Sequence, residues 1–188
     1  MKLQDRLPEG VEVDGKFYKL DFDFRNVFRM LEILDENLMP EAKAYNALHC
    51  LCKRPKNALK VLEAVKALLF TAPRKTGRKV TNFVQDAGLI RAAFRQAYGI
   101  DLYRERLHWI EFTELLSGIP EGSRYAEVIG IRVREIPEPT KYNQKEREWL
   151  LRAKADVALE MTEKERMEQY KRDVDNLGAF LISMAGGE

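Results

Sequence analysis

Apolar residues recur at helical spacing from Phe24 to Leu116, and this period limits the fold of the chain more than any other feature. Each stripe predicts a helix that buries one side against its neighbours. We therefore expect an all-α protein whose main body is a compact helical domain. The expected buried stripes are Phe24, Val27, Phe28, Leu31 and Leu34; Ala58, Val61, Leu62, Val65, Leu68 and Leu69; Phe83, Ala87, Ile90, Phe94, Ala97 and Tyr98; and His108, Trp109, Phe112, Leu115 and Leu116.

Local signals predict where several helices begin and end. Asp23 can cap the first helix through its carboxylate. Pro40 and Pro55 suit the first turn of two further helices, where a missing N–H breaks no hydrogen bond. Gly99 and Gly118 are expected to stop the helices before them.

The N-terminal part departs from the helical pattern. Asp14-Gly15 lies between short apolar runs and can supply the positive φ angles of a two-residue turn. We expect a short antiparallel β-hairpin over residues 11–20. A further short helix is expected between Ser123 and Ile136.

A proline pair marks the expected domain boundary. Pro137-Glu138-Pro139 disfavours helix and predicts a linker at 137–140. The helical domain then covers 1–136, and 141–188 form a charged helical extension. From Lys141 to Asp175 this extension holds nine basic and nine acidic residues, interleaved.

Near its C-terminal end the extension carries a second predicted helix. Thr162 and Glu165 form a capping box that predicts its start. Its apolar residues alternate spacings of three and four, which makes a narrow seam suited to one partner helix. The seam could be buried by its own domain, by a second copy of the chain or by a partner protein, and the linker at 137–140 favours the last two. The seam residues are Met167, Tyr170, Val174, Leu177, Leu181 and Met184.

The charge balance argues against binding to nucleic acid by bulk electrostatics. The chain has 32 basic and 30 acidic residues, a net charge of +2. A local basic stretch at 53–79 leaves open a small nucleic-acid-binding adaptor as the alternative function, because Glu63 is its one acidic residue. Within it, the candidate phosphate contacts are Arg74, Lys75, Arg78 and Lys79.

No pattern of catalytic residues is evident, and we expect no enzyme. The sequence has neither a Gly-rich phosphate loop nor a Gly-x-Ser-x-Gly elbow. His108 lies on an apolar stripe and is expected to be a hydrogen-bonded core residue. With Arg25 and Asp86 it is a candidate member of a buried polar cluster.

Cofactors and metals are not expected either. His49, Cys50 and Cys52 resemble part of a zinc site, but no second Cys/His pair completes it. The close cysteines favour a reducing compartment. Without a secretory h-region or a run of about 18 apolar residues, we expect neither secretion nor a membrane span.

A longer stretch resembles a known family. Residues 85–119, QDAGLIRAAFRQAYGIDLYRERLHWIEFTELLSGI, are similar to the central signature of the bacteriophage gene-product-fifteen family. A Gln-Asp pair, Ala-Ala-Phe, Tyr-Gly-Ile-Asp-Leu and His-Trp followed by Phe and Leu-Leu occur there in that order. Asp23-Phe24-Arg25 and Gly130-Ile131-Arg132 also match in order, and the resemblance covers residues 6–160.

This resemblance implies a role in phage tail assembly. Members are encoded between the major tail protein and the tape-measure protein, which implies a tail assembly chaperone that coats the tape-measure protein in the host bacterial cytoplasm. It implies no catalytic residues. A helical binder with a spare apolar seam could mask the seams of a long helical partner by helix-in-groove docking.

Overall fold

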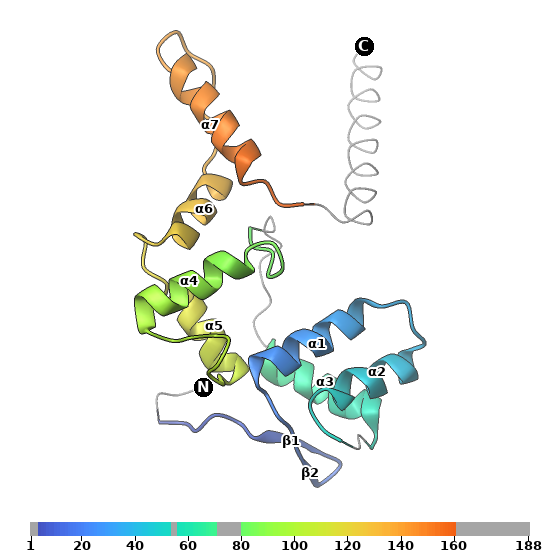
Figure 1. Cartoon of the computed structure of the whole chain (residues 1–188). Coiled ribbons are helices and arrows are strands. Elements are labelled where there is room, and N and C mark those ends of the chain that lie inside the picture. The colour runs from blue at the N-terminus through green and yellow to red at the C-terminus, as the bar shows by residue number, and fades with distance from the viewer. Residues whose placement is uncertain (1–3, 54–55, 71–79, 161–188) are drawn as a thin grey trace, which may run out of the picture. The chain divides into compact units, whose positions relative to one another are not determined.

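The computed structural model describes residues 4–53, 56–70 and 80–160 (Figure 1). Most of these residues are helical, which confirms the prediction of a largely helical protein. The elements are β1 (Gly10–Val13), β2 (Lys16–Lys19), α1 (Phe24–Asp35), α2 (Pro40–His49), α3 (Ala58–Leu69), α4 (Ala87–Tyr98), α5 (Trp109–Ser117), α6 (Arg124–Val133) and α7 (Gln144–Asp156).

Contacts between residues divide the chain into two compact units. The first unit is Met1–Arg78 with Gly88–Glu127, and the second unit is Lys79–Ala87 with Val128–Glu188. The second unit therefore combines two separate stretches of sequence. The predicted domain limits, 1–136 and 141–188 with a linker at 137–140, stay a prediction.

The predicted hairpin is confirmed. β1 and β2 pair antiparallel with Val13 opposite Lys16, so the connection has two residues. These are Asp14, with φ of 50°, and Gly15, with φ of 72°. Positive φ at both positions matches the right-handed twist of the strands, which is why Asp-Gly is favoured here.

Several predicted helix ends in the first unit are also confirmed. The Asp23 side chain accepts a hydrogen bond from Arg25 N–H at the start of α1. Pro40 is the first residue of α2. Gly99, with φ of 71°, follows the end of α4, and Gly118 caps α5.

Two predicted helix starts differ from the structure. α3 begins at Ala58, after Asn57 in the left-handed region, and the predicted start, Pro55, lies outside the described residues. α4 begins at Ala87 instead of near Phe83. The Asn82 Oδ1 accepts hydrogen bonds from the N–H groups of Val84 and Gln85, which holds residues 82–85 in a turn. Local side-chain bonding here replaces a first helical turn.

An aromatic cluster forms much of the core of the first unit. The Phe112 ring of α5 stacks on Phe24 of α1 at 4.8 Å and on Phe94 of α4 at 5.3 Å between ring centroids. Phe28 meets Trp109 edge-on at 5.2 Å. Aromatic contacts of this kind add to burial by about 0.5–1.5 kcal/mol each. The rest of this core lies between α1 and α2 and between α2 and α3.

Candidate partner-binding site

The residues predicted to bind partners are not among those the structure describes. The seam from Met167 to Met184 and the basic loop residues Arg74, Lys75, Arg78 and Lys79 all lie outside the described ranges. The structure does describe the residues that lead into the seam, 157–160, and the surface of the second unit around them.

Arg132 of α6 joins three stretches of the second unit. Its Nη1 and Nη2 donate hydrogen bonds to the Asp86 carboxylate at 2.7 and 2.8 Å. Nη1 also donates to the Val80 carbonyl at 3.0 Å, and Nε donates to the Val157 carbonyl at 2.6 Å. In addition, Lys154 of α7 donates to the Arg132 carbonyl. One guanidinium thereby holds residues 80, 86 and 157 together, using the planar set of donors that lysine lacks.

Asp86 is the buried carboxylate of this arrangement, at 1% exposed. Burial alone would raise its pKa, but hydrogen bonds from Arg132 and from Asn82 N–H, with the Arg132 charge, outweigh burial and lower the pKa below its usual value. The expected burial of Asp86 is confirmed. Its expected partners were wrong: it pairs with Arg132, whereas Arg25 bonds to Asp23.

Gln85 holds the backbone just beyond Val157. Its Nε2 donates to the Ala158 carbonyl at 2.8 Å, and its Oε1 accepts from Glu160 N–H at 2.9 Å. The side-chain amide thus bonds to the backbone on both sides, as a neighbouring strand would. We call Gln85 and Arg132, with the backbone of 157–160 that they bind, the clamp. The clamp fixes the point on the second unit from which residues 161–188 continue.

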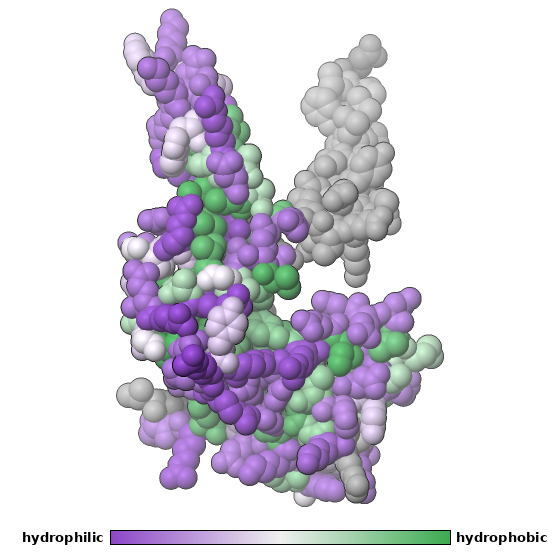
Figure 2. Space-filling model, in the orientation of Figure 1, coloured by the Kyte–Doolittle hydropathy of each residue, from purple (hydrophilic) through white to green (hydrophobic). Residues whose placement is uncertain are grey.

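Large hydrophobic side chains are exposed on the second unit. Of fifteen such residues in the described part of the chain, seven belong to this unit, although it holds fewer of the described residues. Figure 2 shows hydrophobic residues reaching the surface beside hydrophilic ones in the part that contains α6 and α7. This concentration of exposed apolar groups makes the surface of the second unit the candidate binding surface. The seven residues are Phe83, Val84, Val133, Ile136, Tyr142, Trp149 and Leu151.

α7 illustrates this exposure best. Leu150 is 0% exposed and anchors the helix, whereas its neighbours Trp149 and Leu151 are 54% and 48% exposed. Successive residues are about 100° apart on a helix, so Trp149 and Leu151 lie on opposite flanks of the buried stripe. Charged residues occupy most of the remaining surface. The sequence analysis did not single out Trp149, although one tryptophan within a strongly charged helix is the signal that could have found it.

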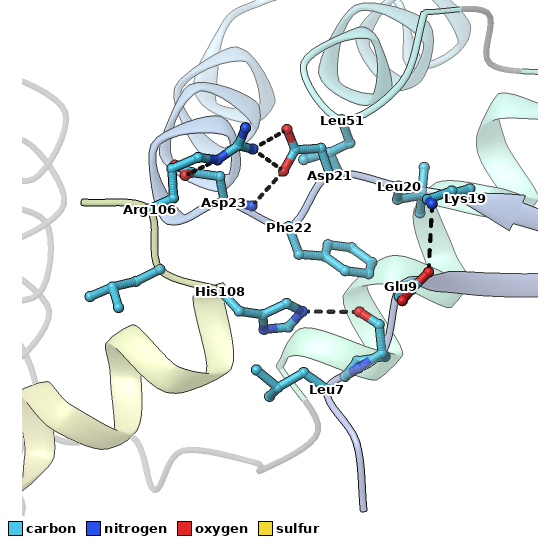
Figure 3. Close-up of a pocket in the computed structure, with 12 residues that line it drawn as sticks. Leu7, Glu9, Lys19, Leu20, Asp21, Phe22, Asp23, Leu51, Arg106 and His108 are labelled. Atoms are coloured by element: carbon cyan, nitrogen blue, oxygen red, sulfur yellow. Dashed lines mark hydrogen bonds and ion pairs between the residues drawn. The ribbon is translucent and has the colours of Figure 1, made fainter. Parts of the chain in front are cut away.

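The first unit also contains a groove (Figure 3). It has a volume of about 640 Å³. Arg106 spans the carboxylates of Asp21, at 2.6 Å, and Asp23, at 3.2 Å. Burial alone would raise the pKa of Asp21, but hydrogen bonds from Arg106 and Asp23 N–H lower it below its usual value. One guanidinium at the groove thus pairs with two carboxylates, and Asp23 also pairs with Arg25.

His108 lies at the rim of this groove with both ring nitrogens engaged. Nδ1 accepts a hydrogen bond from Ile110 N–H at 3.1 Å, which caps α5. Nδ1 must then be unprotonated, so Nε2 carries the hydrogen and donates it to the Pro8 carbonyl at 3.1 Å. The expected hydrogen bonding of His108 is confirmed, but its expected place in the core and in a buried cluster with Asp86 is wrong. The ring is half-buried at a helix end, where it caps α5.

Basic residues of the 53–79 stretch that the structure describes are partly paired. Lys60 contacts Asp14 at 2.8 Å, and Lys66 contacts Glu63 at 3.1 Å. Within the described ranges, no group of three or more His, Cys, Asp or Glu side chains is arranged to hold a metal ion. Likewise, no helix in that part of the chain is long and apolar enough to cross a membrane.

Comparison with known families decides the identity of the chain. A family model described as Bacteriophage Gp15 protein matches residues 3–159. The chain belongs to this family. No curated protein and no solved structure matches it. The Gp15 match ends within the clamp, so the seam at 167–184 lies beyond the matched stretch. Gln85, Asp86 and Arg132, which lie in the Gln-Asp and Gly-Ile-Arg stretches matched from sequence, together form the clamp and its buried ion pair.

Proposed function

We propose that this phage protein is a non-enzymatic tail assembly chaperone that binds the tape-measure protein in the host cytoplasm before the tail tube polymerises. Membership of the Gp15 family supports a phage role. The observation that carries the binding role is the group of exposed apolar side chains on the second unit, beside the clamp that leads into the seam. Such surfaces favour a partner with an apolar face of its own.

The proposed partner has a matching chemistry. A tape-measure protein is long and helical, with apolar stripes that need cover until the tube encloses them. The seam at 167–184 offers side chains at alternating spacings of three and four, which dock one helix. Charged residues of both signs around the seam keep such a binder in solution.

Co-expression with the tape-measure protein tests this proposal. The tagged chain should retain the tape-measure protein through purification. Replacing Val174 and Leu177 by Asp should abolish retention, because the new carboxylates would then face the apolar stripe of the tape-measure protein. The matched control replaces Gln169 and Asn176 by Asp, which adds the same charge off the seam and should leave retention intact. Loss of retention in both variants, or in neither, would contradict a role for the seam.

Salt dependence separates this proposal from the nucleic-acid adaptor that uses residues 53–79. Phosphate contacts release counterions, so binding to DNA or RNA weakens steeply as salt rises. Helix docking through an apolar seam should change little between 50 and about 200 mM salt. A steep decline, relieved by replacing Arg74 and Lys75 with Gln, would favour the adaptor.

A further inference from the structure

We propose that Lys145, Trp149 and Arg152, on one exposed flank of α7, bind a helix of the tape-measure protein that carries acidic residues seven positions apart with an apolar residue between them. We call these three residues the α7 flank. That the partner is the tape-measure protein rests on the proposed function. The preference for an acidic and apolar helix rests on the side chains of the flank itself.

The α7 flank combines one large aromatic side chain with two cations. Trp149 is 54% exposed, and Lys145 and Arg152 are both exposed. Lys145 precedes Trp149 by four residues and Arg152 follows it by three, so the three side chains share one side of the helix. The two cations are separated by about 10.5 Å along the helix axis. A partner lying along α7 therefore meets a charge, an aromatic ring and a second charge in turn.

The packed side of α7 uses its charges to hold the helix in the second unit. Glu146 forms an ion pair with Arg134 at 2.6 Å, and Lys154 donates a hydrogen bond to the Arg132 carbonyl at 2.8 Å. Leu150 is fully buried on that side. In contrast, neither cation of the α7 flank makes a hydrogen bond or an ion pair through its side chain within the described ranges. Both charges are therefore available to a partner.

A second aromatic residue lies just before the helix. Tyr142 is 97% exposed, in the loop that leads into α7. Asn143 holds this loop, because its Oδ1 accepts a hydrogen bond from Thr140 N–H and its Nδ2 donates to the Glu138 carbonyl, each at 2.8 Å. A loop that is ordered before binding loses less entropy when a partner arrives. A partner helix that extends past the start of α7 passes this loop.

The charges of the second unit favour a protein partner over nucleic acid. Its described residues hold equal numbers of basic and acidic side chains, seven of each, so the unit as a whole does not attract a polyanion. Glu148 and Asp156 adjoin the α7 flank and would repel a continuous row of phosphates. A helix presents carboxylates at separate positions, and acidic residues seven apart match the spacing of the two cations. An apolar residue midway between them then covers Trp149.

Fluorescence anisotropy with labelled probe peptides tests the proposal on the full chain. The acidic probe is a helical peptide with glutamate at the a position of each heptad, leucine at d, and alanine and glutamine elsewhere. The basic probe has lysine in place of glutamate. The acidic probe should bind about tenfold more tightly at low salt, because each cation gains a partner instead of a like charge. Binding of neither probe, equal binding of both, or a preference for the basic probe overturns the proposal.

Reversing the two cations shows whether the α7 flank is the surface that binds. The double variant Lys145→Glu with Arg152→Glu should prefer the basic probe, whereas Trp149→Ala should bind the acidic probe about tenfold more weakly than the native chain. The matched control, Lys53→Glu with Lys56→Glu, reverses two exposed lysines of the first unit and should keep the native preference. Circular dichroism checks that each variant is folded. A reversed flank that still prefers the acidic probe, or an unchanged affinity in Trp149→Ala, contradicts binding at this flank.

A labelled oligothymidine distinguishes a helix from single-stranded nucleic acid as the occupant. We expect no binding of oligothymidine to the α7 flank. Oligothymidine binding that disappears when Lys145 and Arg152 are replaced by Glu would assign the flank to nucleic acid and overturn the proposal.

Co-expression of the reversed variant with the tape-measure protein separates this proposal from the proposed function. Loss of retention in Lys145→Glu with Arg152→Glu, but not in the matched control, supports binding at the α7 flank. Unchanged retention contradicts binding there while the chaperone role stands. If the native chain prefers the acidic probe but does not retain the tape-measure protein, the proposed function fails and the preference of the flank stands.

Discussion

Asp86 and Arg132 lie 46 positions apart in the sequence and share two hydrogen bonds of 2.7 and 2.8 Å. Their side chains are 1% and 8% exposed, respectively. Each therefore keeps its charge away from water only because the other is present. Breaking a buried pair is strongly destabilising, since the remaining charge has no partner. This pair also holds the clamp, because Arg132 binds Val157.

Replacing Asp86 by Ala should lower the free energy of unfolding by about 3 kcal/mol or more. Urea denaturation followed by circular dichroism measures this. Glu127→Ala is the control: it removes an exposed partner of Arg124 and should leave the urea midpoint unchanged. A double-mutant cycle with Arg132→Met should show strong coupling, and additive effects would contradict the pairing.

The pH dependence of stability should also report on Asp86. Its lowered pKa means that the folded state favours the ionised carboxylate. The stabilisation is present above the unfolded value of about 3.9 and is lost as the pH falls through the lower folded value. Unfolding midpoints measured from pH 7 to pH 3 should decline below about pH 4. The Asp86→Asn variant should decline less over that range, and an equal decline would show that another group is responsible.

His108→Ala should destabilise the first unit by about 1 kcal/mol, because the Ile110 N–H at the start of α5 loses its acceptor. His108→Asn should recover most of this loss, since asparagine is among the best residues at a helix N-cap. Thermal unfolding of both variants checks the claim. Equal melting temperatures for the two variants would show that capping is not the role of His108.

Gly99→Ala should destabilise by about 1–2 kcal/mol, because its φ of 71° is unfavourable for any residue with a Cβ. Gly88 lies within α4, and a Cβ built there meets no atom within 4 Å. Gly88→Ala should therefore be neutral or stabilise by up to about 1 kcal/mol. We expect a lower urea midpoint for Gly99→Ala and an equal or higher midpoint for Gly88→Ala. A Gly99→Ala midpoint no lower than that of the native sequence would contradict this role of Gly99.

Local features of the fold could be predicted from sequence because their causes lie within a few residues. The Asp14-Gly15 turn, the Asp23 cap and the Gly99 stop each depend on one side chain or one φ angle. The start of α4 was misplaced because Asn82 bonds to the backbone of Val84 and Gln85. The spacing of apolar residues along the sequence does not reveal this competition between a side chain and a helical turn.

The candidate site was harder to predict, because its parts are distant in sequence. Asp86 could be expected to be buried beside apolar residues, but choosing Arg132 as its partner requires the tertiary structure. The spacing of apolar residues alone does not show that Trp149 is exposed while Leu150 is buried. Exposure depends on which neighbouring elements cover the helix. The seam residues remain a prediction from spacing.

The second unit combines residues 79–87 with residues from 128 onward. During translation Asp86 is therefore made 46 residues before Arg132, a delay of about 2–9 s at usual rates of synthesis. In that interval the carboxylate stays hydrated while the intervening residues of the first unit are already available to pack. Protein synthesis thus imposes an order in time on this contact: Asp86 waits for Arg132, and a chain that ends before residue 132 cannot form the pair.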